Sequence, residues 1–519
     1  MDKRDRLASI SSMRFSSTLL LTLSASILLA SAAPEVAPDA PKPDKPAAPE
    51  KKEDVAKEPV VKQGLVEIGG KKIPYKATTG KLVLKDEDGK PRASIFHVSY
   101  ERSDVTDQQK RPVMFAFNGG PGSSAVWLHL GVLGPKRIAI PGDGTTAPAP
   151  PARLLDNPES ILDQCDLVFV DPVSTGYSRA EKDTKPAEFH GVEEDITSIA
   201  DFVRRWVTEH DRWGSPKYLL GESYGGIRVA GLANQLQARY GMSLNGVVML
   251  SSLVDFRTLT ASSGDDLQFS VYLPVYASVA HFHGKLKGDR DALIEEARKF
   301  AFGDYSTALL QGTELTEARR IELAAKLSSF SGIDASIWLA HDLRVDPTFF
   351  RAELLRKEHK VIGRFDARVA WGSTSDANSV ADYDPSYSLA YGAFSSAMMD
   401  YLSHDLGWKE DRPYEILTGK VHPWNWDASN GYVNLSGRLA NAMRDNPHLR
   451  VLVMCGRSDL ATPPDGIAYS FRHMFELPAA QHDNITFTRY DGGHMFYLNP
   501  PDLKKCRADL VEFLDNQKP

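Results

Sequence analysis

The chain has 519 residues, of which 42% are apolar and 25% are charged, and its formal net charge is −7. This composition is typical of a globular protein with one large or two ordinary domains. The negative net charge and the lack of an arginine-rich stretch give no reason to expect nucleic acid as a partner.

The first sixty residues differ in composition from the rest of the chain. Basic residues precede an apolar run at 19–30, which ends in the small residues Ala30-Ser-Ala32. This pattern predicts a cleaved signal peptide over residues 1–33, with an uncleaved membrane anchor as the alternative. Residues 34–60 are rich in Pro, Ala, Lys, Asp and Glu, which predicts a disordered linker. We therefore expect a secreted or periplasmic protein without a stable membrane anchor.

The cysteines and histidines suggest neither a disulfide framework nor a metal site. Cys165, Cys455 and Cys506 are too few and too scattered for such a framework, and a low cysteine count favours a bacterial periplasm. The first two lie in or beside apolar runs, which is typical of small buried residues, although a single bridge remains an alternative. His281 and His283 are the nearest approach to a metal pair and lack a third ligand. We expect no metal and no cofactor.

Apolar runs after the linker alternate between strand-like and helix-like patterns. Acidic and glycine residues at 86–89 separate the first two runs, which predicts a hairpin. Most later strand runs are continuously apolar, as expected of parallel strands buried on both faces. The alternation predicts an α/β fold with a mostly parallel central sheet. The expected strands lie at 72–84, 93–101, 112–118, 166–171, 218–220, 246–251, 450–456 and 485–490, and the clearest helices at 193–209, 230–239 and 503–515.

Residues 221–225 hold the clearest chemical motif. Gly221-Glu-Ser-Tyr-Gly225 follows a short strand and precedes a helix, as in the G-x-S-x-G nucleophile elbow of α/β-hydrolases. Small residues on either side let the backbone turn sharply around Ser223. The helix that follows directs its N-terminal amides back at the serine. The motif therefore predicts Ser223 as a nucleophile.

A serine nucleophile needs a general base and a group that orients this base. In α/β-hydrolases these partners follow the serine in the order acid, then histidine, each on a loop after a strand. Gly456-Arg-Ser-Asp459 follows the strand at 450–456, and Asp491-Gly-Gly-His494 follows the strand at 485–490. The order and placement predict the triad Ser223, Asp459 and His494 and an α/β-hydrolase fold.

The stretch between the strand ending near Ser252 and the one at Arg450 breaks the alternation of strands and helices. It is helical, rich in aromatic residues and about 190 residues long, which is too long for a loop. We expect a helical cap insertion at 256–447 that divides the α/β-hydrolase domain into residues 61–255 and 448–519. Its aromatic segment at 422–426 either lines the active-site pocket or belongs to the core of the cap.

The run Asn118-Gly-Gly-Pro-Gly-Ser-Ser124 ends a strand upstream of the elbow, where the hydrolase fold places an oxyanion-hole donor. The glycines let the backbone approach a substrate carbonyl closely. The N–H group of one of them can act together with the N–H of Tyr224 to stabilise a tetrahedral oxyanion.

Taken in order, these motifs resemble the serine carboxypeptidase family, and within it a bacterial branch. The segment Asp171-Pro-Val-Ser-Thr-Gly-Tyr-Ser178 adds to the resemblance, which extends from about residue 90 to 515 apart from the cap. The resemblance implies that the oxyanion hole is formed by Gly120 and Tyr224. It also implies that the C-terminal carboxylate of a substrate is bound by Asn118, Gly119 and Glu222. Because Glu222 can donate a hydrogen bond only while protonated, such binding is best in acid.

Two positions depart from the family pattern. Ser123 stands where the family usually has a cysteine, in keeping with the low cysteine content. Val132 stands two residues before Gly134-Pro135, where the family commonly has a second glutamate that shares a proton with the one beside the serine. Without that partner, burial alone raises the pKa of Glu222. We therefore predict that peptidase activity declines at a lower pH than in relatives with both acids.

The sequence thus predicts a secreted serine carboxypeptidase that acts on peptides with a free C-terminus through an acyl-enzyme at Ser223. An esterase or acyltransferase on the same scaffold is the alternative, because the fold alone does not fix the chemistry. Asn118 and Glu222 favour the peptidase, since a neutral ester needs no carboxylate-binding pair. A catalytically silent binding protein is disfavoured by the intact triad. The sequence does not indicate the oligomeric state or the preferred C-terminal side chain.

Overall fold

The structure, a computed structural model, describes residues 58–429 and 431–515. The expected signal peptide at 1–33 and nearly all of the expected linker at 34–60 lie outside the described residues. The strands are β1 (Val60–Ile68), β2 (Lys71–Lys85), β3 (Pro91–Arg102), β4 (Val113–Phe117), β5 (Lys136–Ile138), β6 (Leu154–Asp156), β7 (Asp166–Val170), β8 (Arg179–Ala180), β9 (Lys217–Glu222), β10 (Gly246–Leu250), β11 (Lys360–Ile362), β12 (Ala370–Gly372), β13 (Arg450–Gly456) and β14 (Ile485–Tyr490). The α-helices are α1 (Val126–Leu128), α2 (Val192–Glu209), α3 (Gly225–Tyr240), α4 (Leu267–Phe282), α5 (Arg290–Phe300), α6 (Ser306–Leu309), α7 (Glu317–Ser331), α8 (Ala335–Ala340), α9 (Pro347–Glu353), α10 (Pro385–His404), α11 (Ser436–Asp445), α12 (Pro464–Arg472) and α13 (Pro500–Asp515).

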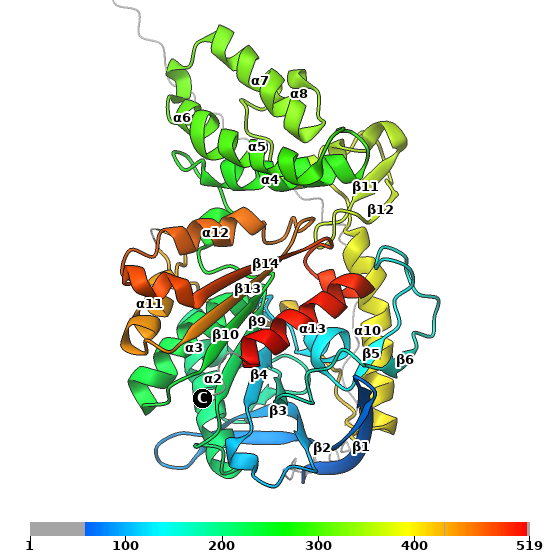
Figure 1. Ribbon diagram of the computed structural model, residues 1–519, viewed down its shortest axis with the longest axis vertical. Coiled ribbons are helices and arrows are strands. Elements are labelled where there is room, and N and C mark those ends of the chain that lie inside the picture. The colour runs from blue at the N-terminus through cyan, green and yellow to red at the C-terminus, as the bar shows by residue number, and fades with distance from the viewer. Residues whose placement is uncertain (1–57, 430, 516–519) are drawn as a thin grey trace, which may run out of the picture. The chain divides into compact units, whose positions relative to one another are not determined.

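Within the described residues, one ten-stranded sheet forms the centre of the fold (Figure 1). Its strand order is β1-β2-β3-β7-β4-β9-β10-β13-β14, with β8 paired to β3. The pairs from β1 to β7 are antiparallel, and every pair from β7 to β14 is parallel. The predicted α/β-hydrolase fold class, with a mostly parallel central sheet, is confirmed.

Two apolar cores lie on opposite faces of the sheet, because successive side chains of a strand point to opposite sides. Along β4, Met114 and Ala116 belong to one core, whereas Phe115 and Phe117 belong to the other. Helices α10 and α13 cover the first core, and α2, α3 and α11 cover the second (Figure 1). Both faces of the parallel strands are therefore buried, which explains their continuously apolar sequences.

The predicted strands and helices agree with the structure to within a few residues, except at the N-terminal side of the helices. Strands β13 and β14 have the predicted bounds, and β2 and β3 form the predicted hairpin. Helix α3 begins at Gly225, the last residue of the nucleophile-elbow motif, five residues before the predicted start at 230. Strand β1 was not expected, because its sequence mixes polar residues and a glycine with its apolar residues. It adds an antiparallel strand beside β2.

Helices α4 to α9 have an apolar core of their own. Helix α4 packs against α12, and the Tyr272 hydroxyl donates a hydrogen bond of 3.2 Å to the Leu460 carbonyl in the loop after β13 (Figure 1). Helices α10 and α11, in contrast, pack on the two cores of the sheet. The division into hydrolase parts and a cap at 256–447 stays a proposal, and within this range α10 and α11 are the α-helices whose side chains belong to the two apolar cores of the sheet.

The three cysteines are buried and free. Burial raises the pKa of each thiol, to about 11 for Cys455. They therefore pack as small apolar residues, and the alternative of a single bridge is not realised. Among the described helices, none combines the length and the apolar character needed to cross a membrane.

Candidate active site

Ser223 lies between β9 and α3 with φ of +62°, in the left-handed region that a serine rarely adopts. Its backbone N–H donates to the carbonyl groups of Leu250 and Ser251 at 3.2 and 3.1 Å. A Cβ atom added to Gly221 would lie 2.2 Å from the Gly225 carbonyl oxygen, and one added to Gly225 would lie 2.8 Å from the Phe117 carbonyl oxygen. The sharp turn therefore requires glycine on both sides of the serine.

His494 and Asp459 form a buried hydrogen-bonded pair. The imidazole Nδ1 is 2.8 Å from Asp459 Oδ2, and both side chains are buried. The other carboxylate oxygen, Oδ1, accepts hydrogen bonds from the backbone N–H groups of Ala461 and Thr462 at 2.7 and 2.9 Å. Burial opposes a charge on His494, but the Asp459 carboxylate outweighs it and raises the pKa of the imidazole. Asp459 thus fixes the orientation of the ring and favours its protonated form.

Ser223 and His494 line one cavity of about 300 Å³. The ring of Phe365 stacks on the imidazole, with ring centroids 5.1 Å apart and planes 18° apart. The Phe365 carbonyl also accepts a hydrogen bond from the His494 backbone N–H. Among the hydrogen bonds of the described residues, none joins the Ser223 hydroxyl to His494. The structure thus brings the serine and the histidine to one cavity, with Asp459 on the far side of the imidazole.

The glycine loop after β4 packs against the elbow. A Cβ atom added to Gly119 would lie 2.4 Å from the Tyr224 backbone nitrogen, so only glycine allows this approach. Gly120 and Gly122 have φ of +106° and +102°, which a residue with a side chain adopts only under strain. Both Gly119 and Gly120 line the cavity. The predicted oxyanion donors therefore lie on two backbone segments that touch each other.

Asp171 fixes the C-terminal end of this glycine loop through a hydrogen bond to Ala125. Its Oδ1 atom accepts a hydrogen bond of 2.9 Å from the Ala125 backbone N–H, and burial raises the pKa of Asp171 to about 7. The Ser178 hydroxyl donates to the Asp171 carbonyl and accepts from the Phe96 backbone N–H at 2.7 Å. The motif at 171–178 thus ties the loop to β3.

Glu222 and Asn118 form a buried pair at the wall of the cavity. Asn118 Nδ2 donates to Glu222 Oε2 at 2.9 Å, and Asn118 Oδ1 accepts from the Leu128 backbone N–H at 3.2 Å. The Tyr497 hydroxyl also donates to the carboxyl group, 3.1 Å from Oε2 and 3.3 Å from Oε1. Glu222 is 3% exposed, and burial raises its pKa to about 7. The carboxyl group is therefore protonated in weak acid.

Arg228 of α3 supports Asn118 from the protein interior. Its Nη1 atom donates to the Asn118 carbonyl, and its Nε atom lies 2.8 Å from Asp195 Oδ2 on α2. Both charged side chains are buried. A buried ion pair therefore holds the start of the glycine loop in place.

The other candidates from the sequence have structural roles or border the cavity. His281 and His283 bond to the carbonyl groups of Gly288 and Ala367 at 3.0 and 2.7 Å, and the described residues contain no group of three side chains suited to a metal ion. In the 422–426 segment, His422 lines the cavity, while Trp424 packs edge-on against the Tyr224 ring at 5.6 Å.

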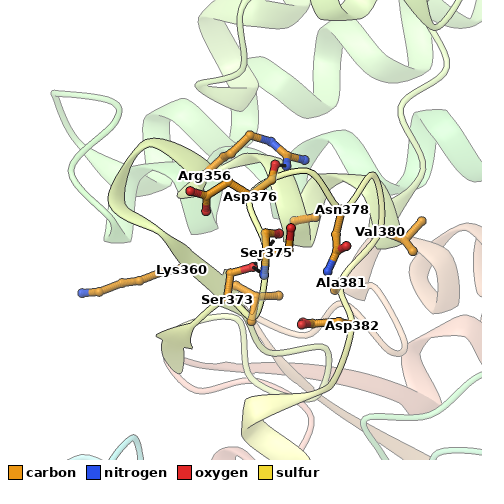
Figure 2. A pocket seen from close by; sticks show the side chains of 11 residues that line it. Arg356, Lys360, Ser373, Ser375, Asp376, Asn378, Val380, Ala381 and Asp382 are labelled. Carbon is orange, nitrogen blue, oxygen red and sulfur yellow. Dashed lines mark hydrogen bonds between the residues drawn. The ribbon is translucent and has the colours of Figure 1, made fainter.

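A second hollow lies beside β11 and β12, and Figure 2 shows the polar side chains around it, among them Arg356, Asp376 and Asn378. Its volume is about 10 Å³, which is room for about one water molecule. Its lining includes none of the predicted site residues. The hollow is therefore too small to be a substrate site.

Comparison with known proteins identifies the family. The sequence profile of the serine carboxypeptidase family matches residues 70–492. The chain belongs to the serine carboxypeptidase family. Among curated relatives, serine carboxypeptidase-like 9 of Arabidopsis thaliana is 24% identical over 184 residues, which are 35% of this chain and 39% of that protein. Pheromone-processing carboxypeptidase kex1 of Sclerotinia sclerotiorum is 30% identical over 142 residues, 26% of this chain and 20% of that protein.

These matches span less than half the length of the curated relatives. A solved structure of similar fold is that of Kex1(delta)p, a prohormone-processing carboxypeptidase from Saccharomyces cerevisiae, with a TM-score of 0.54. At 15% sequence identity, the likeness covers 85% of this chain and 92% of that chain. The two proteins therefore share a fold over most of the described residues.

Sequence reasoning missed one hydrogen-bond partner of Glu222, which is Tyr497. It follows the His494 turn in a short 3₁₀ segment, Phe496–Leu498, and belongs to no predicted motif. A Cβ atom added to Gly131 would lie 2.5 Å from the Tyr497 ring, so the tyrosine packs on the turn that carries Val132. The expectation that burial alone raises the pKa of Glu222 is wrong in one respect. Burial is the largest influence, but the charge of Asp459 also raises the pKa, whereas His494 and the hydrogen bonds from Tyr497 and Asn118 lower it.

Proposed function

We propose that this chain is a serine carboxypeptidase that removes C-terminal residues from peptides with a free C-terminus. The observation that carries the proposal is the position of Asn118 and Glu222 in the cavity that Ser223 and His494 line. A hydrolase of neutral esters would gain nothing from a buried amide and a protonated acid beside its nucleophile. A substrate carboxylate, in contrast, needs two such donors.

In the proposed mechanism, the Ser223 hydroxyl attacks the last peptide bond and His494 takes its proton. Asp459 accepts the hydrogen bond of the imidazole Nδ1 and stabilises the imidazolium that forms. The backbone N–H groups of Gly120 and Tyr224 bind the oxyanion of the tetrahedral intermediate. His494 then gives its proton to the leaving amine, and water hydrolyses the acyl-enzyme by the same steps in reverse order.

Binding of the terminal carboxylate restricts cleavage to one bond. Asn118, the Gly119 amide and protonated Glu222 would hold this carboxylate, which places the last peptide bond at Ser223. Because the pKa of Glu222 is about 7, the donor is present in weak acid and is lost in base. The proposed enzyme is therefore an exopeptidase that works best below neutral pH.

We propose further that the enzyme belongs to a bacterial branch of the family and works in the periplasm after cleavage of a signal peptide at 1–33. The charge and apolar pattern of residues 1–33 and the low cysteine count support this location. N-terminal sequencing of the mature protein from a periplasmic extract tests it. A first residue at or near position 34 is expected, and an intact N-terminus would contradict it.

The activity is tested by incubating the protein at pH 6 with a blocked dipeptide and, separately, with a simple ester. Release of the C-terminal amino acid is measured for the wild type and for Ser223→Ala. We expect release by the wild type and none by the variant. Turnover of the ester without release from any dipeptide would overturn the proposal in favour of an esterase or acyltransferase.

A further inference from the structure

The active-site cavity contains one arginine without an acidic partner. Among the described residues that line it, Arg364 is the sole lysine or arginine, and Glu222 is the sole acid. The Arg364 guanidinium lies over the Phe365 ring, 4.8 Å from its centroid, and forms no ion pair with any described residue. Arg344, in contrast, is paired with Asp266. An exposed cation in a substrate cavity is available to a ligand.

Arg364 is held close to the predicted general base. The guanidinium, the Phe365 ring and the His494 ring form a stack, with 5.1 Å between the two ring centroids. The backbone of this segment is fixed as well. The Arg364 N–H donates to Asp384 Oδ1 at 3.0 Å, and the Arg364 carbonyl accepts from the Leu460 N–H at 3.1 Å. The Arg364 backbone is therefore fixed, and its guanidinium lies on the ring that stacks on His494.

An aromatic wall joins Arg364 to the carboxylate-binding end of the cavity. Trp127 precedes Leu128, whose N–H binds Asn118 Oδ1. The Trp127 ring lies 6.3 Å from Tyr387, and the Tyr387 ring lies 6.0 Å from Phe365. All three rings line the cavity. A residue whose carboxylate is held at Asn118 would therefore extend its side chain along this wall.

We infer that Arg364 selects substrates whose C-terminal residue has an acidic side chain, aspartate or glutamate. This inference rests on the proposed carboxypeptidase function. A guanidinium forms two parallel hydrogen bonds with a carboxylate, and the methylene groups of the substrate side chain pack on the aromatic wall. A C-terminal lysine or arginine is repelled by the same charge. Among the described residues that line the cavity, none besides Glu222 has a carboxyl group that could offset this repulsion.

The inference is tested with blocked dipeptides that share one penultimate residue and end in Glu, Gln, Leu or Lys. The measured quantity is kcat/KM at pH 6, where a substrate glutamate is ionised and Glu222 is protonated. We expect the wild type to prefer Glu over Gln about fivefold or more, and less so at high salt. Arg364→Gln should abolish this preference, and Arg364→Glu should favour Lys.

Lys357→Gln is the matched control, because Lys357 is an exposed cap cation that does not line the cavity. It should retain the preference of the wild type. Equal rates for Glu and Gln, or a preference that survives in Arg364→Gln, would overturn the inference while release of Leu leaves the carboxypeptidase intact. An acidic preference at the penultimate residue instead would overturn the assignment to the C-terminal residue. No release from any dipeptide would overturn the proposed function itself.

Discussion

The substitution Glu222→Gln keeps the size and shape of the side chain but removes its titratable proton. A carboxyl group donates a hydrogen bond to a substrate carboxylate only while protonated, whereas an amide donates at every pH. The pKa of Glu222 is about 7 because the side chain is buried. We therefore predict that kcat/KM for a blocked dipeptide declines above pH 7 in the wild type relative to Glu222→Gln.

The size of the effect follows from this pKa. With a pKa of about 7, the protonated fraction falls from about nine tenths at pH 6 to about one tenth at pH 8. The ratio of kcat/KM of the wild type to that of Glu222→Gln should therefore fall about tenfold over this interval. His494 does not produce this difference, because its neutral form, the general base, becomes more abundant in both enzymes as the pH rises.

Stability gives a second readout of the same group. The folded-state pKa of about 7 exceeds the ordinary value of 4.5, so the folded protein binds this proton more tightly than the unfolded chain. The resulting stabilisation is complete below pH 4.5 and is lost as the pH rises to about 7. Glu222→Gln should therefore lose less unfolding free energy than the wild type between pH 5 and 8, by up to about 3 kcal/mol.

The assay is release of the C-terminal amino acid from pH 5 to 9, with urea unfolding at the two ends of the range. An alkaline decline in Glu222→Gln equal to that of the wild type would refute the reasoning. Val132→Glu introduces the second acid that the family pattern implies, and a like charge near Glu222 would raise its pKa further. The decline should move to higher pH in this variant, and coincident curves would contradict the predicted role of Val132.

Three further substitutions test the surroundings of the site. Tyr497→Phe removes a hydrogen bond that lowers the pKa of Glu222, so the alkaline decline should move to higher pH, and an unchanged profile would assign the tyrosine a packing role only. Asp459→Asn should reduce kcat on the order of 10⁴-fold with unchanged thermal unfolding, because the imidazole loses its orienting acceptor, and a loss under about tenfold would remove Asp459 from the triad. Arg228→Leu leaves the buried Asp195 unpaired and should lower the unfolding free energy by about 3–5 kcal/mol. Adding Asp195→Leu should restore most of this loss, and a double variant as unstable as the single one would contradict the pairing.

The fold could be predicted mainly where burial is complete. Strands β4, β7, β10 and β13 read as continuous apolar runs because both of their faces are covered. Strand β1 pairs only with β2 at the edge of the sheet, and several of its side chains are exposed, so its sequence has no such run. The packing of α10 and α11 on the sheet depends on contacts between distant segments, which local periodicity does not report.

The site could be predicted where a residue belongs to a local motif. Ser223, His494 and Asp459 each follow a strand at a glycine-containing turn, and this placement is visible in the sequence. Tyr497 and Arg364 lie in segments without a motif, and only the tertiary structure brings Tyr497 to Glu222 and Arg364 to the cavity that Ser223 lines. For such residues, sequence spacing holds no information on which groups meet.

Recognition of a free C-terminus is tested most directly by comparing one blocked dipeptide as the free acid and as its C-terminal amide at pH 6. The two substrates share the scissile bond and both side chains and differ only in the carboxylate. Loss of two or three hydrogen bonds to a charged group should lower kcat/KM for the amide by at least about a hundredfold. Equal rates for the acid and the amide would contradict the assignment of Asn118 and Glu222, and with it the carboxypeptidase function.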